Sequence, residues 1–517
     1  MSASPSRSRR LARRLGAGLT AAVVVAALAA CSSPGSGAGP SGAAGSGTGT
    51  LNLGLVGSVN DTLFPYVAQS TAGEGAIWLN TLDTLTRLDD KGVLQMGLAE
   101  SFTPNADNTV WTVKLRPDVA LHSGATFGAD DVIFSIRKMF ELKDSFGAIT
   151  QISSFVSPDK VKKIDDLTVE FTLSKPYGIF PSAWAYEQLA MIGKTSTEKK
   201  VDGTGPFTVG SFEPNQQASL TRFDDYWGEK PGFDKLEVYF FADQQAIVNA
   251  LQGGQIDLTS AVPLSNVDAL KAAGIQFLES DSATHLTLDM RTDVAPFDDP
   301  RVRQALQLIV DRDAVVEAAY NGYAKVGNDV DLASGCPAPD LPQRKQDLQK
   351  AKQLLAEAGK PDLTVDLVTD GAFQGMTEVA QLINQDAAQI GVTVNVKTMD
   401  TGSLLDKWLQ WPFVVNLVGS SYLTSMPGHL LPDGQDNASH WNNADFANLA
   451  TELFNTTDAS AQCAVIAKLQ AVQYADSPSI IPALPKDLTP HSARVKGLHT
   501  DPYGHTSESF AGVTVTD

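Results

Sequence analysis

Three neighbouring hydroxyl side chains, Ser420, Ser421 and Tyr422, form the part of this chain whose residue types best suit ligand binding. Hydroxyl groups both donate and accept hydrogen bonds, so they suit a sugar or another polar ligand. The backbone around Gly419 could instead add an extended peptide as a further strand through main-chain hydrogen bonds. The chemistry predicted here is non-covalent binding, and the choice between a peptide and a sugar stays open.

Two tryptophans, Trp408 and Trp411, precede this segment, and their rings could stack on a ligand or pack a core. The chain has no HExxH, paired CxxC or GxSxG motif, and its seven histidines are scattered. His429 and His440 fall on one predicted loop, but two histidines alone do not define a metal site. We therefore predict no catalytic residue, no metal ligand and no cofactor.

The elements that must position these residues follow from the spacing of apolar side chains. Trp111, Val113 and Leu115 alternate with polar residues, which predicts a half-buried strand. Asp299 followed by Pro300 predicts the start of a helix, because aspartate caps free N–H groups and proline suits the first turn. Further elements predicted in this way are strand 235–241, a helix from Asp243 to Gly253, helix 347–358, and a strand, helix and strand over 363–368, 376–390 and 392–396, whose order implies parallel strands.

The chain has 517 residues, which is more than one hydrophobic core can serve, because single cores stop growing at about 250–300 residues. Its formal net charge is −20, although the first 30 residues contribute five arginines and no acid. This acidity argues against a nucleic-acid partner, which would require a basic surface. We interpret the acidity as a contribution to solubility.

The N-terminus has the features of an export signal. Arginines crowd residues 7–14, and an apolar run over residues 15–30 leads to Cys31. The run is shorter than the roughly 20 residues of a spanning helix. We predict a signal peptide over residues 1–30 and a flexible linker over residues 31–50, rich in Gly, Ser and Ala. Small residues before Cys31 resemble a bacterial lipobox, which implies a lipid on this cysteine; the alternative is an uncleaved signal anchor.

Cys336 and Cys463 remain as an even pair after Cys31 is assigned to the lipid. An even pair in an exported protein suits a disulfide, because the compartment is oxidising. Two separate thiols are the alternative.

Ordered blocks of residues resemble the family 5 extracellular solute-binding proteins, the peptide- and nickel-binding components of ABC importers. The blocks include Trp111–Pro117, Ala129–Ser135, Gly203-Thr204-Gly205-Pro206-Phe207 and Pro296–Leu306. The resemblance covers about residues 51–495. It implies the α/β fold of the type II periplasmic binding proteins, with two lobes and an extra domain. The implied boundaries are 51–84, 199–285 and 486–517 for domain I, 85–198 for domain II, and 286–485 for domain III.

The same resemblance implies a substrate-binding protein that is not an enzyme. It would capture an extracellular solute, an oligopeptide or another polar ligand, and deliver it to a membrane permease with its ATPase. We expect a monomer that is lipid-anchored to the outer face of the cell membrane, with Tyr66 and His285 as further ligand contacts. The alternatives are a ligand-sensing lipoprotein without import, and a binding protein for an oligosaccharide or a metal complex.

One position departs from the family pattern. Peptide-binding relatives usually show Trp-x-x-Asp, whose aspartate grips the α-ammonium group of the peptide. Here Ser420 stands in place of the tryptophan and Leu423 in place of the aspartate. A buried ammonium group facing leucine would lack its charge partner. We therefore predict that dipeptides are held weakly at this position, unless a shifted alignment brings Asp433 or Asp436 into the role.

Overall fold

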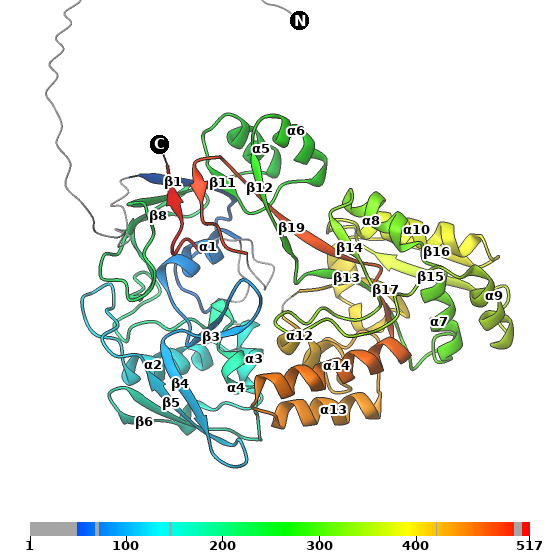
Figure 1. Ribbon diagram of the computed structural model, residues 1–517, viewed down its shortest axis with the longest axis horizontal. Coiled ribbons are helices and arrows are strands. Elements are labelled where there is room, and N and C mark those ends of the chain that lie inside the picture. Colours follow the sequence, from blue (N-terminus) through cyan, green and yellow to red (C-terminus); the bar gives the residue numbers. More distant parts are fainter. Residues whose placement is uncertain (1–48, 68–71, 144–146, 420, 501–508, 517) are drawn as a thin grey trace, which may run out of the picture. The chain divides into compact units, whose positions relative to one another are not determined.

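The computed structural model of the protein describes residues 49–67, 72–143, 147–419, 421–500 and 509–516. In these residues the strands form sheets of eight, five and four members and two smaller pairs (Figure 1). The pairs are β2 (Thr86–Leu88) with β3 (Leu94–Met96), and β20 (Val495–Lys496) with β21 (Thr514–Val515).

The eight-stranded sheet is assembled from segments far apart in the sequence. At its centre, β1 lies parallel to both β10 and β11, and β19 returns late in the chain to pair with β12, β11 and β14. The strand predicted over 235–241 is β10, and Asp243 caps the following helix by accepting a hydrogen bond from Ala246 N at 2.8 Å. The elements are β12 (Gln276–Asp281), β19 (Ala483–His491), β11 (Leu258–Thr259), β1 (Thr50–Val56), β10 (Lys235–Phe241), β9 (Gln217–Arg222), β8 (Phe207–Glu213), β14 (Ala324–Val326), α1 (Ala72–Thr81), α5 (Gln244–Gln252) and α6 (Val267–Ala272).

The four-stranded sheet is antiparallel, in the order β4-β5-β7-β6. Trp111, Val113 and Leu115 of β5 are buried while their neighbours are not, as the alternation predicts. The elements are β4 (Ala99–Pro104), β5 (Val110–Leu115), β6 (Val161–Asp165), β7 (Thr168–Thr172), α2 (Ala129–Glu141), α3 (Thr150–Ser153) and α4 (Phe180–Ala183).

The five-stranded sheet has the order β16-β15-β17-β13-β18, and β15 and β16 are parallel, as predicted. Asp299 caps α7 through its carboxylate, which accepts from Arg301 N at 2.9 Å, with Pro300 in the first turn. Figure 1 shows α8 beside α10 and α7 beside α9. The elements are β13 (His285–Met290), β15 (Thr364–Thr369), β16 (Thr393–Thr398), β17 (Phe413–Val418), β18 (Ser479–Ile480), α7 (Pro300–Leu308), α8 (Arg312–Tyr320), α9 (Leu348–Glu357), α10 (Met376–Ala388), α11 (Thr401–Leu405), α12 (Tyr422–His429), α13 (Ala444–Asn455) and α14 (Ala459–Asp476).

The turn after β5 docks on the glycine loop that starts at Gly203. His122 N donates to Gly203 O at 2.8 Å, and the His122 ring lies 3.0 Å from Gly205 O. A side chain at Gly203 would bring its Cβ within 1.9 Å of Thr81 O at the end of α1. Glycine is therefore required here by close packing of three backbone segments.

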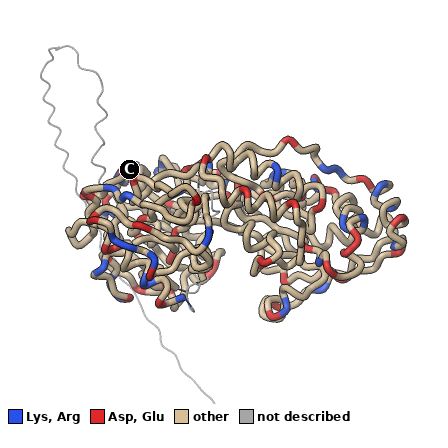
Figure 2. Tube along the Cα trace, turned by 90° about the horizontal axis from the view of Figure 1, so that it is seen from below, with Lys and Arg blue, Asp and Glu red and all other residues tan. Residues whose placement is uncertain are grey.

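One hydrophobic core joins the four-stranded sheet to α13 and α14. Its largest members include Trp111 and Phe180 from the sheet region and Trp441 and Phe446 from the helical region. Tyr177 stacks on Phe454 at 5.5 Å between ring centroids, which adds an aromatic contact between the two regions. Figure 2 shows acidic and basic positions interspersed along the described trace, so the acid excess is not confined to one segment.

Candidate ligand-binding site

The hairpin of β2 and β3 lines two cavities with its two faces. In its register Arg87 pairs with Gln95 and Leu88 with Leu94. Because side chains alternate along a strand, Arg87 and Gln95 line one cavity, and Leu94 and Met96 line the other. We call these the polar pocket and the apolar cavity.

The apolar cavity has a volume of about 360 Å³, within the usual range for small-ligand sites. Its walls come from the hairpin, the four-stranded sheet, the loop before Cys336, the start of α12, and α14. The apolar side chains that line it are Leu88, Val93, Leu94, Met96, Phe102, Pro104, Trp111, Ile179, Pro181, Ala333, Tyr422, Leu423, Ala459 and Ile466.

Two glycines and a disulfide hold one wall of the apolar cavity. Gly92, at the hairpin turn, and Gly335 have φ of +76° and +82°. An added Cβ at Gly335 would lie 2.4 Å from Gly92 O, so the two backbones touch. Cys336, the next residue, forms a disulfide with Cys463 of α14, with a Cα–Cα distance of 5.3 Å. The loop is thereby tied covalently to one side and packed on the hairpin at the other.

The first turn of α12 places Ser421, Tyr422 and Leu423 at the apolar cavity. Tyr422 is 3% exposed. Burial, and then the charge of Asp331, raise the pKa of the Tyr422 phenol well above its usual value. The Tyr422 hydroxyl is buried and has no hydrogen-bond partner among the described residues.

His285 and Asp331 form a buried pair, and Asp331 is the residue whose charge acts on Tyr422. His285 Nε2 lies 2.8 Å from Asp331 Oδ1, and Gln473 Nε2 donates to Asp331 Oδ2 at 2.9 Å. Burial by itself would raise the pKa of the Asp331 carboxyl. The hydrogen bond from His285 and the charges of His285 and His429 lower this pKa by more, so the pKa lies below its usual value. Asp331 is therefore a buried carboxylate whose charge is compensated by its neighbours.

A second histidine lies near a second buried carboxylate. His429 Nε2 is 3.9 Å from Asp289 Oδ1. Asp289 also accepts from Ser479 Oγ at 2.7 Å and from Asn416 Nδ2 at 3.1 Å. Within the described residues, no group of three or more His, Cys, Asp or Glu side chains is arranged to hold a metal ion.

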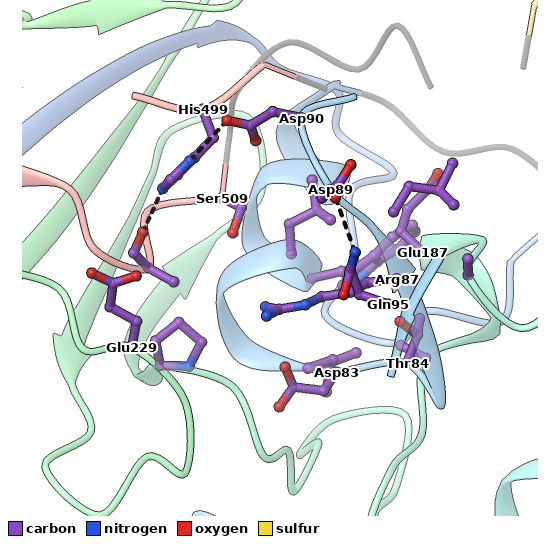
Figure 3. A pocket seen from close by; sticks show the side chains of 18 of the residues that line it. Asp83, Thr84, Arg87, Asp89, Asp90, Gln95, Glu187, Glu229, His499 and Ser509 are labelled. Atoms are coloured by element: carbon purple, nitrogen blue, oxygen red, sulfur yellow. Dashed lines mark hydrogen bonds and ion pairs between the residues drawn. The ribbon is translucent and has the colours of Figure 1, made fainter. Parts of the chain in front are cut away.

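The polar pocket has a volume of about 560 Å³ and lies on the other face of the hairpin. Figure 3 shows Arg87 extending into its middle, with Asp83 on one side and Asp90 and His499 across from it. His499 Nδ1 lies 3.4 Å from Asp90 Oδ2. Charged side chains therefore gather on this face, whereas the opposite face of the hairpin is apolar.

Residues 93–435 match the sequence family described as bacterial extracellular solute-binding proteins, family 5 Middle. The chain belongs to this family. Family 5 proteins bind solutes for ABC transporters outside the cytoplasm, and they are not enzymes. None of the described helices is long and apolar enough to span a membrane.

Curated family 5 relatives resemble the chain over most of its length. Heme-binding protein A of Haemophilus influenzae is 27% identical over 462 residues, which cover 82% of this chain and 84% of that protein. The glutathione-binding protein GsiB of Escherichia coli (strain K12) is 30% identical over 359 residues, which cover 67% of this chain and 69% of that protein.

Solved family 5 structures share the fold, that of the type II periplasmic binding proteins with mixed α/β sheets. HbpA2 from Haemophilus parasuis has a TM-score of 0.81 at 23% identity, with 91% of this chain and 100% of that chain covered. DppA from Helicobacter pylori, in complex with the peptide STSA, has a TM-score of 0.70 at 23% identity, with 91% of this chain and 99% of that chain covered.

The structure brings together only some of the residues predicted as ligand contacts in this family 5 protein. Ser421 and Tyr422 line the apolar cavity, and Gly419 and His285 lie at adjoining ends of the paired strands β17 and β13. Ser420 and Cys31 lie outside the described residues.

The other three predicted contacts lie elsewhere. Tyr66 is buried in a core, where its hydroxyl donates to Ala190 O at 2.8 Å. Trp408 and Trp411 pack around Val368 of β15 and Val414 near the start of β17, whereas Gly419 follows the end of β17. The two tryptophans are therefore separated from the hydroxyl segment by the length of β17.

Several residues at the two cavities were not predicted as site residues. Arg87, Gly92 and Gly335 belong to segments that sequence spacing presents as ordinary turns and strands. The signal that the sequence offered was the glycine at positions 92 and 335, since glycine permits close backbone approach; the structure shows that both have positive φ.

Proposed function

We propose that this family 5 protein captures an oligopeptide, or another polar ligand that carries an apolar group, in the apolar cavity. From a lipid anchor on Cys31 it would deliver the ligand to an ABC permease. The observation that carries the proposal is Leu423, which lines the cavity where peptide-binding relatives usually have aspartate. The cavity therefore offers apolar contact where such relatives offer a charge.

The composition of the walls supports this ligand class. Burying an apolar ligand group among these side chains contributes about 25 cal/mol for each Å² removed from water. Tyr422 lines the cavity, and its buried hydroxyl has no hydrogen-bond partner among the described residues. A buried polar atom left unpaired costs about 1–3 kcal/mol, so a polar ligand group or a water that reached this hydroxyl would stabilise the complex.

The relatives do not identify the ligand. They are named for heme and glutathione, and one solved structure holds a peptide. The family scaffold thus accepts chemically different ligands, and the side chains of each cavity decide between them. Mass spectrometry of compounds that co-purify with the protein is the direct way to identify the ligand.

The lipid anchor is supported by the apolar run that ends at Cys31 and by the linker that follows. Cys31→Ala should abolish labelling by radioactive palmitate and release the protein or leave it as a precursor. Unchanged membrane labelling of the variant would exclude Cys31 as the lipidated residue.

Calorimetry with an end-blocked peptide, N-acetyl-Leu-Phe-amide, would test the apolar cavity without any contribution from terminal charges. Leu423→Asp should weaken binding of this probe by about tenfold or more, because a carboxylate would replace an apolar wall. Leu405→Asp is the matched control, since Leu405 is 56% exposed and does not line the cavity. Equal effects of the two substitutions, or no binding of the probe to the unmodified protein, would contradict the proposed ligand class.

A further inference from the structure

The polar pocket holds more charged side chains than its own hydrogen bonds engage. Asp89 accepts from Lys91 N at 2.9 Å, Val93 N at 3.0 Å and Gln95 Nε2 at 2.9 Å, which closes the hairpin turn. Asp90 lies beside His499. These two carboxylates have local partners that do not include Arg87.

Asp83 is likewise occupied. It accepts from Trp227 Nε1 at 2.9 Å, Thr204 Oγ1 at 2.8 Å and the Tyr226 hydroxyl at 3.2 Å. Burial raises the pKa of Asp83, while these hydrogen bonds and the charge of nearby Arg87 oppose the rise. Asp83 therefore forms a hydrogen-bonded wall of the pocket and does not pair directly with Arg87.

Arg87 keeps its guanidinium group available to a ligand. Arg87 is exposed, and its side chain makes no hydrogen bond or ion pair with any described residue, although it reaches into the middle of the pocket (Figure 3). A guanidinium group presents five donors in a planar fork that fits a carboxylate with two parallel hydrogen bonds. Carboxylates nevertheless outnumber cationic side chains around the pocket, with Glu229 exposed at its margin. A simple anion would meet this negative field, whereas an ammonium group would be attracted by it.

We propose that the polar pocket is a second binding site, separate from the apolar cavity, for a small zwitterion such as a free amino acid or a very short peptide. Arg87 holds the carboxylate of this ligand, and the surrounding carboxylates, Glu229 among them, attract its ammonium group. The volume of about 560 Å³ is ample for a dipeptide. This site goes beyond the proposed function, because it uses neither Leu423 nor any other residue of α12.

Calorimetry of the full chain with glycylglycine at low ionic strength tests the proposal, since this probe has no side chain for the apolar cavity. Arg87→Gln should weaken glycylglycine binding about tenfold or more, as expected for losing hydrogen bonds to a charged group. Arg137→Gln is the matched control, because it removes the same charge from a residue that is exposed and lines neither cavity. Arg87→Lys should restore part of the affinity, and Glu229→Gln should weaken binding by a smaller factor.

Blocked forms of the probe assign the two charges. C-terminal amidation should reduce binding to the unmodified protein and have little further effect on Arg87→Gln, whereas N-acetylation should reduce binding to both. The proposal is overturned if Arg87→Gln and Arg137→Gln bind glycylglycine equally, or if the unmodified protein does not bind it at millimolar concentration. Either result would leave the apolar cavity and its end-blocked probe untouched, so the two proposals fail separately.

Discussion

The two faces of the β2–β3 hairpin contact side chains of very different chemistry. On one face Leu94 and Met96 meet apolar side chains from the four-stranded sheet and α12. On the other face Arg87 and Gln95 meet carboxylates and a histidine. Alternation along three-residue strands separates the side chains, but the partners on each face come from other parts of the chain.

The two faces also differ in what holds their walls in place. A disulfide and a backbone contact between Gly92 and Gly335 fix a wall of the apolar cavity. Hydrogen bonds to Asp83 and Asp89 organise the polar pocket. Covalent and steric constraints are insensitive to salt and pH, whereas charged hydrogen bonds respond to both. The comparison therefore predicts stronger stability effects from changes on the apolar side.

Removing the disulfide should have the largest effect. The cysteines are 127 positions apart, and in the chain-entropy account a bridge that closes a loop of this length destabilises the unfolded chain by about 5 kcal/mol. The double variant Cys336→Ser/Cys463→Ser should lose that much unfolding free energy in urea titrations. Adding a reductant should lower the stability of the unmodified protein and leave the double variant unchanged. Equal stability of both proteins without reductant would show that the bridge does not support this wall.

Gly335→Ala should come next, with a loss of about 2–4 kcal/mol in unfolding free energy. The new Cβ would lie 2.4 Å from Gly92 O, and the backbone at φ +82° is strained for any side chain. Gly359→Ala is the matched control, because Gly359 has φ +69° with nothing within 4 Å of the added Cβ. Gly359→Ala should lower the unfolding free energy by about 1–2 kcal/mol, which is the cost of the backbone conformation without a steric contact. If the two substitutions cost the same, the contact with Gly92 adds nothing.

Exchanging chemistry between neighbouring hairpin positions tests the two faces directly. Met96→Gln places an amide against the apolar cavity and should cost about 1–3 kcal/mol of unfolding free energy. Gln95→Met removes the donor to Asp89 on the polar face and should cost about 1 kcal/mol or less. Chemical denaturation of both variants measures the difference. A larger loss for Gln95→Met would reverse our assignment of the faces.

Asp331 should give the smallest effect, visible mainly as a pH dependence. Because its pKa in the folded protein lies below the usual 3.8, the charged form contributes stability above that pH and loses it as the pH falls through the folded-state pKa. The stability difference between the unmodified protein and Asp331→Asn should therefore be constant near neutral pH and shrink below about pH 4. Asp340→Asn, at an exposed loop position, should show no such trend in urea unfolding between pH 3 and 7. A difference that grew in acid would mean that the pKa of Asp331 is raised instead.

Local elements of this fold were predictable because their signals are local. The strand 235–241 is β10, the helix expected over 347–358 spans Leu348–Glu357, and β15 and β16 are parallel as their order implied. Apolar–polar alternation in strands, capping residues of helices and glycines at helix ends all depend on neighbours within a few residues, so a single sequence suffices to find them. The family resemblance rested on such blocks, and the comparison with family 5 confirms it.

The sequence by itself also determined that position 423 is leucine and therefore offers no carboxylate, whereas the structure places this residue in the first turn of α12. Only the tertiary structure decided what that leucine faces. Gly92 touches Gly335 across more than 240 positions, and Asp331 meets both His285 and Gln473, because separate segments are folded against one another. Trp408 and Trp411 show the converse, since residues close in sequence to Gly419 are carried away from it by β17. Spacing along a chain fixes direction within one element, whereas the contents of a cavity depend on which distant elements pack around it.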